Sequence, residues 1–366
     1  MFSTTPNAPS DTPLSVLSDH SFGVSAVAFS RDSRWLCTLG NTYDAFILIY
    51  SINPKNGSAR LHSSNKCSNV NFVTWLGQSV ISIGTRHAKV WRVEKATPMS
   101  PSKTRLEMDN TATAPPGSPT PKTFSGRNCL LGILIDATFT AVVAISDQRA
   151  ILCTAQGDIC LLDDTQRTQR LERVAKVDFG ILCVTLDNNV DRIYVAGQNG
   201  GMRSISLNDL LEGSKSPGST NGSSLRRSAS ILSTVKKRGV VAIGVVRERI
   251  VTIDSNRIIE LESAKESDEP GASSVSSKRL AAHESAVLGV CSLLPKLAED
   301  DADFLTFSAK GTVLFWRLSG ESTASIEIPL EQPKSVEDGD TNELKIVAHS
   351  RSDGFLISGD KSGVLR

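Results

Sequence analysis

The residues that could carry chemistry are few, and the sequence keeps them apart. The five histidines lie in different parts of the 366-residue chain, at His20, His62, His87, His283 and His349. A catalytic base or a zinc ligand needs partner side chains at a defined spacing. His62 with Cys67 could supply half of a zinc site, but no second pair follows at ligand spacing. The pattern therefore predicts no catalytic residue and no metal site.

The cysteines and glycines point the same way. The seven cysteines are scattered, mostly inside apolar runs, at Cys37, Cys67, Cys129, Cys153, Cys160, Cys183 and Cys291. Their odd number and the lack of a CxxC pair are typical of reduced, buried thiols in an intracellular protein. No phosphate-binding glycine motif occurs, and turn geometry explains Gly197, Gly200 and Gly201. We expect no cofactor.

Composition limits the kinds of partner. A net charge of +1 with 22% charged residues argues against a general binder of nucleic acid or of membrane surfaces. No apolar run approaches the ~20 residues that span a bilayer. The amino-terminal stretch lacks the basic and apolar regions of a signal peptide. We therefore predict a cytoplasmic protein that binds neither nucleic acid nor membranes.

The elements that must position these residues are short strands. Within residues 22–51, apolar residues alternate over 24–28 and 35–39, and an apolar run covers 46–50. Turn-forming residues separate the three segments, as an antiparallel meander requires. The apolar run 129–134 is a further predicted strand that opens a later unit.

This unit returns along the chain at a spacing of roughly 40 residues once insertions are subtracted, which is the length of a propeller blade. We predict an all-β fold, a β-propeller of about six blades plus a partial seventh, as an open or incomplete ring. The predicted blades cover approximately 19–57, 61–95, 122–164, 169–211, 234–262, 279–319 and 343–366. Residues 1–18 are predicted to be a flexible tail, and 96–121, 212–231, 263–277 and 331–342 to be disordered insertions.

Several unit ends resemble WD40 blades, which carry a histidine before the first strand and a Trp-Asp-like end. In that family a His, a Ser or Thr, a turn Asp and the Trp form a hydrogen-bond network that locks each blade. The resemblance implies blade-locking roles for His20, Thr38, Asp44, Tyr50, Trp91, His283, Ser308, Trp316 and Asp360. Lys310 stands where a turn Asp is expected, and Tyr50 replaces a Trp. The middle units, which lack Trp, are expected to rely on apolar packing.

A narrower resemblance covers residues 19–207. The runs FGVSAVAFSRDSRWLCTLG, NVNFVTW and above all GTRHAKVW at Gly84–Trp91 are similar to the WD-repeat scaffold family of mitogen-activated protein kinase-binding protein 1 and its microcephaly-associated spindle relative. The resemblance implies further blades before His20 and after Arg366. The chain would then be a fungal-type or partial member.

These resemblances imply a noncatalytic protein-interaction scaffold that assembles kinase-signalling or spindle-associated partners, with a mitogen-activated protein kinase among them. They also imply association with the spindle or an equivalent of the centrosome. Arg86, His87 and Lys89 are the candidate partner contacts. Two alternatives stay open: a structural subunit of a larger complex, and a propeller enzyme with acidic and histidine side chains converging on the central channel.

The insertions also contain candidate modification sites. The candidates are Thr97, Ser100, Ser118, Thr120 and Ser216, each followed by proline, and Ser230, with an arginine three residues before it. A phosphate on such a segment would add nearly two negative charges and could order it against arginines. The basic run 236–238 before an apolar stretch resembles a kinase docking segment. We favour a solvated cluster preceding a strand, because a paired strand cannot also lie in a kinase groove.

Overall fold

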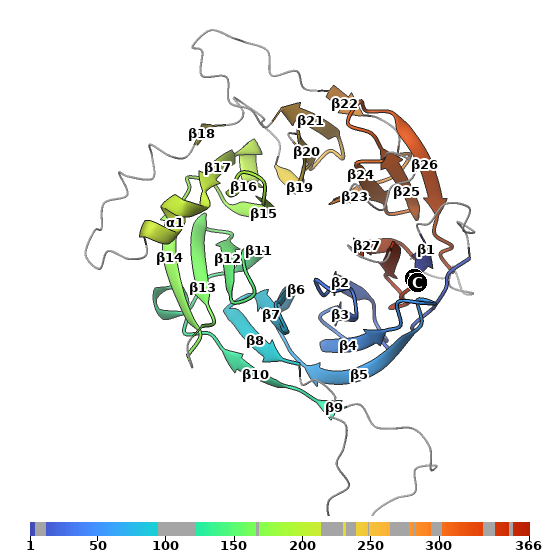
Figure 1. Cartoon of the computed structure of the whole chain (residues 1–366), viewed down its shortest axis with the longest axis horizontal. Coiled ribbons are helices and arrows are strands. Elements are labelled where there is room, and N and C mark those ends of the chain that lie inside the picture. Colours follow the sequence, from blue (N-terminus) through green and yellow to red (C-terminus); the bar gives the residue numbers. More distant parts are fainter. Residues whose placement is uncertain are drawn as a thin grey trace, which may run out of the picture.

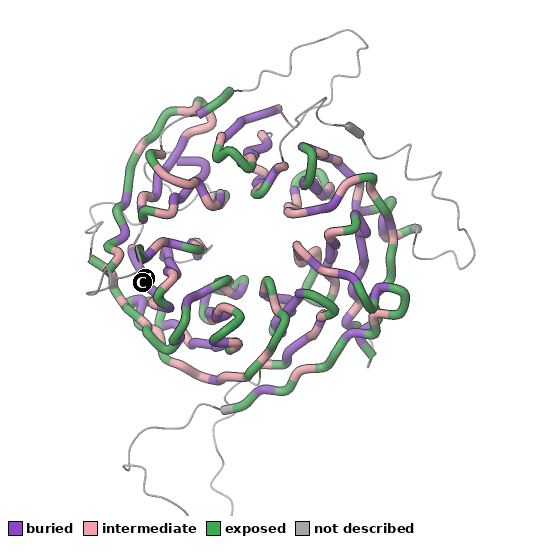
Figure 2. Tube along the Cα trace, turned by 180° about the vertical axis from the view of Figure 1, so that it is seen from behind, coloured by how far each residue is buried: buried purple, intermediate pink, exposed green. Residues whose placement is uncertain are grey.

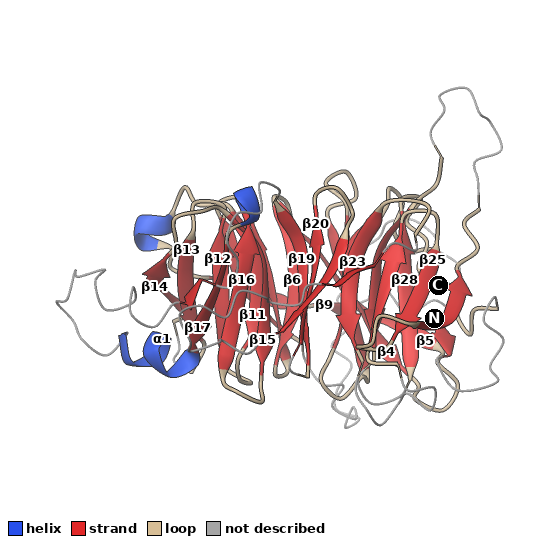
Figure 3. Cartoon of the chain, turned by 90° about the horizontal axis from the view of Figure 1, so that it is seen from above, coloured by secondary structure: helices blue, strands red, loops and turns tan. Residues whose placement is uncertain are grey.

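The computed structural model describes residues 1–3, 12–93, 122–165, 168–213, 230–231, 239–247, 249–263, 278–280, 283–293, 302–331, 341–350 and 354–366. Over these residues the strands form seven small sheets arranged in a ring, which is a seven-bladed β-propeller (Figure 1). The side view shows a disc with loops gathered at its two faces (Figure 3). The predicted all-β propeller class is confirmed.

Each blade is a meander that runs outward from the ring axis, and its strands are antiparallel except for the short parallel addition of β9 to β5. The first blade contains β2 (Val24–Phe29), β3 (Trp35–Gly40), β4 (Phe46–Ile52), β5 (Ala59–Lys66) and β9 (Lys122–Thr123), and the second contains β6 (Val70–Leu76), β7 (Ser79–Gly84), β8 (His87–Arg92) and β10 (Ser125–Asn128). The third contains β11 (Phe139–Ala144), β12 (Arg149–Thr154), β13 (Asp158–Asp163) and β14 (Arg170–Lys176), the fourth β15 (Ile181–Asp187), β16 (Arg192–Gly197), β17 (Met202–Ser206) and β18 (Ser230–Ile231), and the fifth β19 (Val240–Val246), β20 (Arg249–Asp254), β21 (Ile259–Ser263) and β22 (Lys278–Leu280). The sixth contains β23 (Val287–Ser292), β24 (Phe304–Ser308), β25 (Thr312–Trp316) and β26 (Ser322–Glu327), and the seventh β27 (Leu344–His349), β28 (Phe355–Asp360) and β1 (Phe2–Ser3). Helical structure is confined, within the same residues, to η1 (Gly132–Leu134), η2 (Gln198–Gly200) and α1 (Leu207–Gly213).

The innermost strand of each of these seven blades carries the same irregularity near its start. Its pairing with the second strand shifts after the first residue, which leaves one bulged residue per blade. The bulged residues are Ser25, Asn71, Thr140, Leu182, Val241, Leu288 and Lys345. A bulge bends a strand and increases its twist. Its recurrence marks the blades as copies of one structural unit.

The hydrophobic core lies between neighbouring blades. Ile47 and Ile49 of the first blade pack with Val73, Val80 and Trp91 of the second, and other blade pairs form similar clusters. The middle strands are buried on both faces, whereas the outermost strands are partly exposed (Figure 2). Since burying apolar surface supplies most of the stabilisation, each blade depends on its neighbours.

The ring closes through its seventh sheet, which corrects the expected partial blade and open ring. Phe2 of β1 pairs with Leu356 of β28, and Leu17 pairs with Leu365. Val24 packs with Ile357 and Leu365, so the first blade has a neighbour on each side. Phe2 and Ser3 are thus ordered in a sheet and Met1 is buried, although the sequence predicts a flexible tail there.

The outermost strands depart from the predicted units. β5 and β9 belong to the first blade, and β10 joins the second blade from the far side of the insertion that follows β8. β14 belongs to the third blade, although the sequence assigns residues 169–211 to the fourth. The predicted insertions lie largely outside the described residues.

Candidate functional site

In the first blade, hydrogen bonds join three of the residues with predicted locking roles, His20, Thr38 and Asp44, whereas Tyr50 bonds to a residue outside that set. His20 Nδ1 bonds to Asp44, and its Nε2 lies 2.8 Å from Thr38 Oγ1. Tyr50 donates its hydroxyl proton to Asp19 Oδ2 at 3.0 Å. Burial raises the pKa of Tyr50, and the negative charge of Asp19 raises it further. These side chains join the loop before β2 to the middle of the blade.

In the sixth blade the network centres on Thr306. Trp316 Nε1 donates to Thr306 Oγ1 at 2.8 Å, and His283 Nε2 lies 2.7 Å from the same oxygen. Ser308 Oγ is buried and has no hydrogen-bond partner among the described residues, nor has His283 Nδ1. The locking hydroxyl is therefore two residues earlier than the sequence prediction placed it.

In the second blade the histidine of the network is the first residue of the third strand, β8, whereas in the first and sixth blades it precedes the innermost strand. Trp91 Nε1 donates to Ser82 Oγ at 2.8 Å, and His87 Nε2 lies 2.7 Å from that oxygen. Burial, with a smaller contribution from the charge of Lys89, lowers the pKa of His87 to about 4. His87, a candidate partner contact in the sequence analysis, is thus half-buried, and its ring is bonded within the blade.

Two further blades carry polar networks around a turn aspartate. Asp158 receives the Thr154 hydroxyl at 3.3 Å, and its own backbone N–H donates to Thr154 Oγ1 at 2.9 Å. Asp360 accepts from Asn342 Nδ2 at 3.1 Å and also bonds to Ser362. Sequence reasoning missed Ser82, Thr154 and Thr306; the available signal is a hydroxyl residue inside the apolar run of a blade's second strand.

Of the other two predicted contacts in the second blade, Arg86 is exposed and Lys89 is half-buried. Arg86 stands at a turn with φ 56°, and its Nε lies 3.5 Å from Asp136 Oδ1, with both side chains mainly exposed. Lys89 Nζ lies 3.9 Å from the centre of the Trp91 ring. Arg86 thus contacts Asp136, which lies in the segment that joins the second and third blades.

That connecting segment exposes large apolar side chains. Leu130, Ile133 and Ile135, here called the apolar ridge, are 62%, 78% and 56% exposed. The backbone on either side is fixed, because Leu130 N–H donates to Gln169 O at 3.0 Å and Arg86 N–H donates to Ala137 O at 2.9 Å. The sequence predicts a strand over 129–134; the structure has a single bridge at Leu130 followed by η1.

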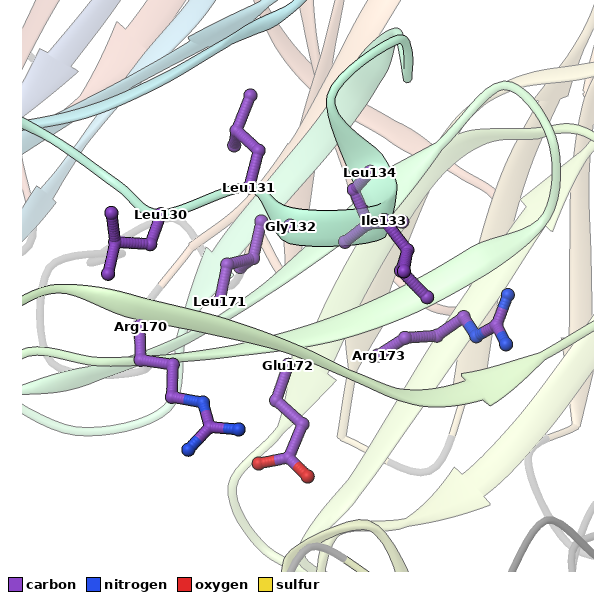
Figure 4. A pocket seen from close by; sticks show the side chains of 9 residues that line it. All are labelled: Leu130, Leu131, Gly132, Ile133, Leu134, Arg170, Leu171, Glu172 and Arg173. Carbon is purple, nitrogen blue, oxygen red and sulfur yellow. The ribbon is translucent and has the colours of Figure 1, made fainter.

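A groove separates this segment from β14. We call it the β14 groove; its cavity is about 550 Å³ and is lined by Leu130, Leu131, Gly132, Ile133, Leu134, Arg170, Leu171, Glu172 and Arg173 (Figure 4). Figure 4 shows apolar side chains of residues 130–134 on one wall and the charged side chains of β14 on the other.

The charges beside the groove are unequal. Arg173 Nη1 and Lys176 Nζ each lie 3.5 Å from the same oxygen of the buried Asp158. Arg170 and Glu172 form no ion pair within the described part of the chain. One carboxylate thus serves two cations.

A larger cavity, of about 700 Å³, lies where the innermost strands of several blades meet. Its titratable lining residues are Arg31, Asp147 and His349. Arg31 and Asp147 are 3.6 Å apart and exposed, whereas burial lowers the pKa of His349 to about 4. No group of three or more His, Cys, Asp or Glu that could hold a metal ion occurs among the described residues.

The remaining predicted sites are placed as follows. Thr97, Ser100, Ser118, Thr120 and Ser216 lie outside the described residues, and Ser230 belongs to β18. Burial raises the pKa of the cysteine thiols, to about 12 at Cys129 and Cys291. None of the helices that the structure describes is long and apolar enough to cross a membrane.

Comparison with models of protein families and with curated proteins found no match to this chain.

Proposed function

We propose that the protein is a noncatalytic interaction scaffold, in which a closed seven-bladed ring presents exposed side chains to other proteins. The apolar ridge is the observation that carries the proposal. Three large apolar side chains are each more than half exposed on a backbone that hydrogen bonds hold at both ends. Large apolar side chains exposed close together in sequence, on a fixed segment, are a feature of interaction sites.

The cavity of about 700 Å³ between the innermost strands gives less support to the alternative that the protein is a propeller enzyme. A propeller enzyme would gather carboxylates and imidazoles from several blades at the ring axis. The described lining of the cavity contains one imidazole, His349, and one carboxylate, Asp147, and the latter stands beside Arg31. A pocket with so few convergent titratable groups favours binding over acid–base chemistry.

The partners we propose come from the sequence resemblance alone. They are kinase-signalling or spindle-associated proteins, and a mitogen-activated protein kinase is among them. We also propose a cytoplasmic location, on the basis of composition, and association with the spindle or an equivalent of the centrosome, on the basis of the same resemblance.

Affinity purification from cells tests this proposal. The tagged protein is compared with Ile133→Glu, and with Val190→Glu as the matched control, because Val190 is 54% exposed in a loop of another blade. We expect a reproducible set of proteins that Ile133→Glu depletes and Val190→Glu retains. A stoichiometric complex that survives both changes would favour a structural subunit. Recovery of no protein above background would contradict the scaffold.

A further inference from the structure

We infer that the β14 groove binds an extended acidic segment of a partner protein, in which apolar side chains alternate with carboxylates. This inference rests on the proposed interaction function and names the site and the chemistry of its occupant.

The shape and lining of the groove favour apolar side chains. Its volume of about 550 Å³ lies within the range of ligand pockets. Leu130 and Ile133 are exposed above it, while Leu171 is buried at its base. Gly132 has φ +53°, and no atom lies within 4 Å of the position a Cβ would take there. A partner's backbone can therefore approach this wall closely.

The position of β14 favours an extended occupant. β14 is the outermost strand of the third blade, and its first residue, Arg170, forms a parallel bridge with Leu130. In the described structure the bridge covers only that end, α1 packs against the other half of the strand, and no further strand joins β14 between them. An edge strand pairs readily with an added peptide strand, whose side chains then alternate between the groove and solvent.

The charged side chains on and beside β14 indicate the net charge expected of the partner segment. Arg170, Arg173 and Lys176 stand along β14. The carboxylates beside them are Glu172, Asp158 and Asp163, the register partner of Arg170, and Asp163 is paired with a fourth cation, Arg149. The cations outnumber the carboxylates, so the surface favours an acidic segment over a basic one. A second copy of this chain is disfavoured, because a twofold contact here would bring the arginines of both copies together.

The test is a binding titration with two labelled peptides. In one, leucine alternates with aspartate; in the other, leucine alternates with lysine. We expect the aspartate peptide to bind and the lysine peptide to bind at least tenfold more weakly, a difference of about 1.4 kcal/mol. Fluorescence anisotropy measures both, and the melting temperature of each variant confirms that it is folded.

Four variants locate the binding. Ile133→Glu should weaken the aspartate peptide about tenfold or more, since it removes apolar contact and adds a like charge. Arg170→Glu should weaken it by about fivefold, and Glu172→Arg should strengthen it by a similar factor. Val190→Glu should leave binding unchanged.

Three outcomes would overturn the inference: no binding of the aspartate peptide, equal binding of both peptides, or indifference to the charge reversals at positions 170 and 172. A dimer in sedimentation that Ile133→Glu dissociates would identify a second copy as the occupant instead. If the peptides fail while Ile133→Glu still depletes cellular partners, the scaffold proposal stands and the acidic-segment inference falls.

Discussion

Two buried hydroxyls on one strand allow a direct test of how the sixth blade is locked. Thr306 and Ser308 both lie on β24 and both are buried. The Thr306 oxygen accepts from Trp316 Nε1 at 2.8 Å and lies 2.7 Å from His283 Nε2, whereas Ser308 Oγ has no partner in the described structure. Thr306→Val and Ser308→Ala should therefore differ sharply in stability.

The magnitude follows from the groups left behind. Thr306→Val keeps the side-chain volume but leaves the buried Trp316 N–H without an acceptor, and an unsatisfied buried donor costs about 1–3 kcal/mol. His283 loses its contact as well, so we expect a loss of about 2–3 kcal/mol in the free energy of unfolding. Ser308→Ala removes a hydroxyl that makes no bond, so we expect a change within about 0.5 kcal/mol.

Urea titration followed by tryptophan fluorescence measures both variants. The midpoint of Thr306→Val should fall at an unchanged slope, which would show that native stability changed rather than the denatured state. Equal losses for the two variants, or a larger loss for Ser308→Ala, would refute the assignment of Thr306 as the locking hydroxyl.

Three further predictions concern other parts of the ring. Burial lowers the pKa of His349 to about 4 from 6.5, so between these pH values the unfolded chain binds more protons than the folded chain, and stability falls as the pH drops. His349→Gln should therefore flatten the dependence of the urea midpoint on pH. The same dependence on pH in the variant and the original protein would contradict this. Tyr50→Phe removes the 3.0 Å bond to Asp19 and should cost about 1 kcal/mol by the same titration; no measurable loss would exclude a locking role for the hydroxyl. Arg92→Met removes the cation 2.8 Å from the buried Asp164 and should cost about 2 kcal/mol, with Arg86→Met, at an exposed pair, as the near-neutral control. Equal losses from Arg92→Met and Arg86→Met would refute the distinction between buried and exposed pairs.

The sequence was sufficient for the fold class because the blade unit repeats its alternation and its turns. Trp91 and Trp316 could be placed on the third strand of their blades from the pattern alone. The choice between Thr306 and Ser308 could not, because residues two apart on a strand face the same side and both fit the alternation. Only the position of His283, which lies against Thr306 in the structure, distinguishes the two hydroxyls.

His87 and the run 129–134 show a second limit. His87 directly follows the turn residue Arg86, which suggests exposure, yet it is the first residue of β8 and its ring bonds to Ser82. The run 129–134 is continuously apolar apart from Gly132, as a buried strand would be. Its backbone instead turns at Gly132, so Leu134 is buried while Ile133 is exposed. Exposed apolar residues on a connecting segment cannot be distinguished from core residues by composition.

Ring closure depends on contacts between residues far apart in sequence. The residues that follow Ser3 are mainly polar and include several prolines, a composition typical of a flexible tail. Phe2 pairs with Leu356, a residue more than 350 positions away, so no local sequence pattern predicts this contact.

The most direct test of the scaffold account is site-specific photo-crosslinking in cells. A photoreactive amino acid replaces Ile133 in one version of the protein and Val190 in another, and crosslinked products are identified by mass spectrometry. The account predicts discrete crosslinked partners from position 133 and none of these from position 190. An absence of products at position 133, or the same products from both positions, would contradict it.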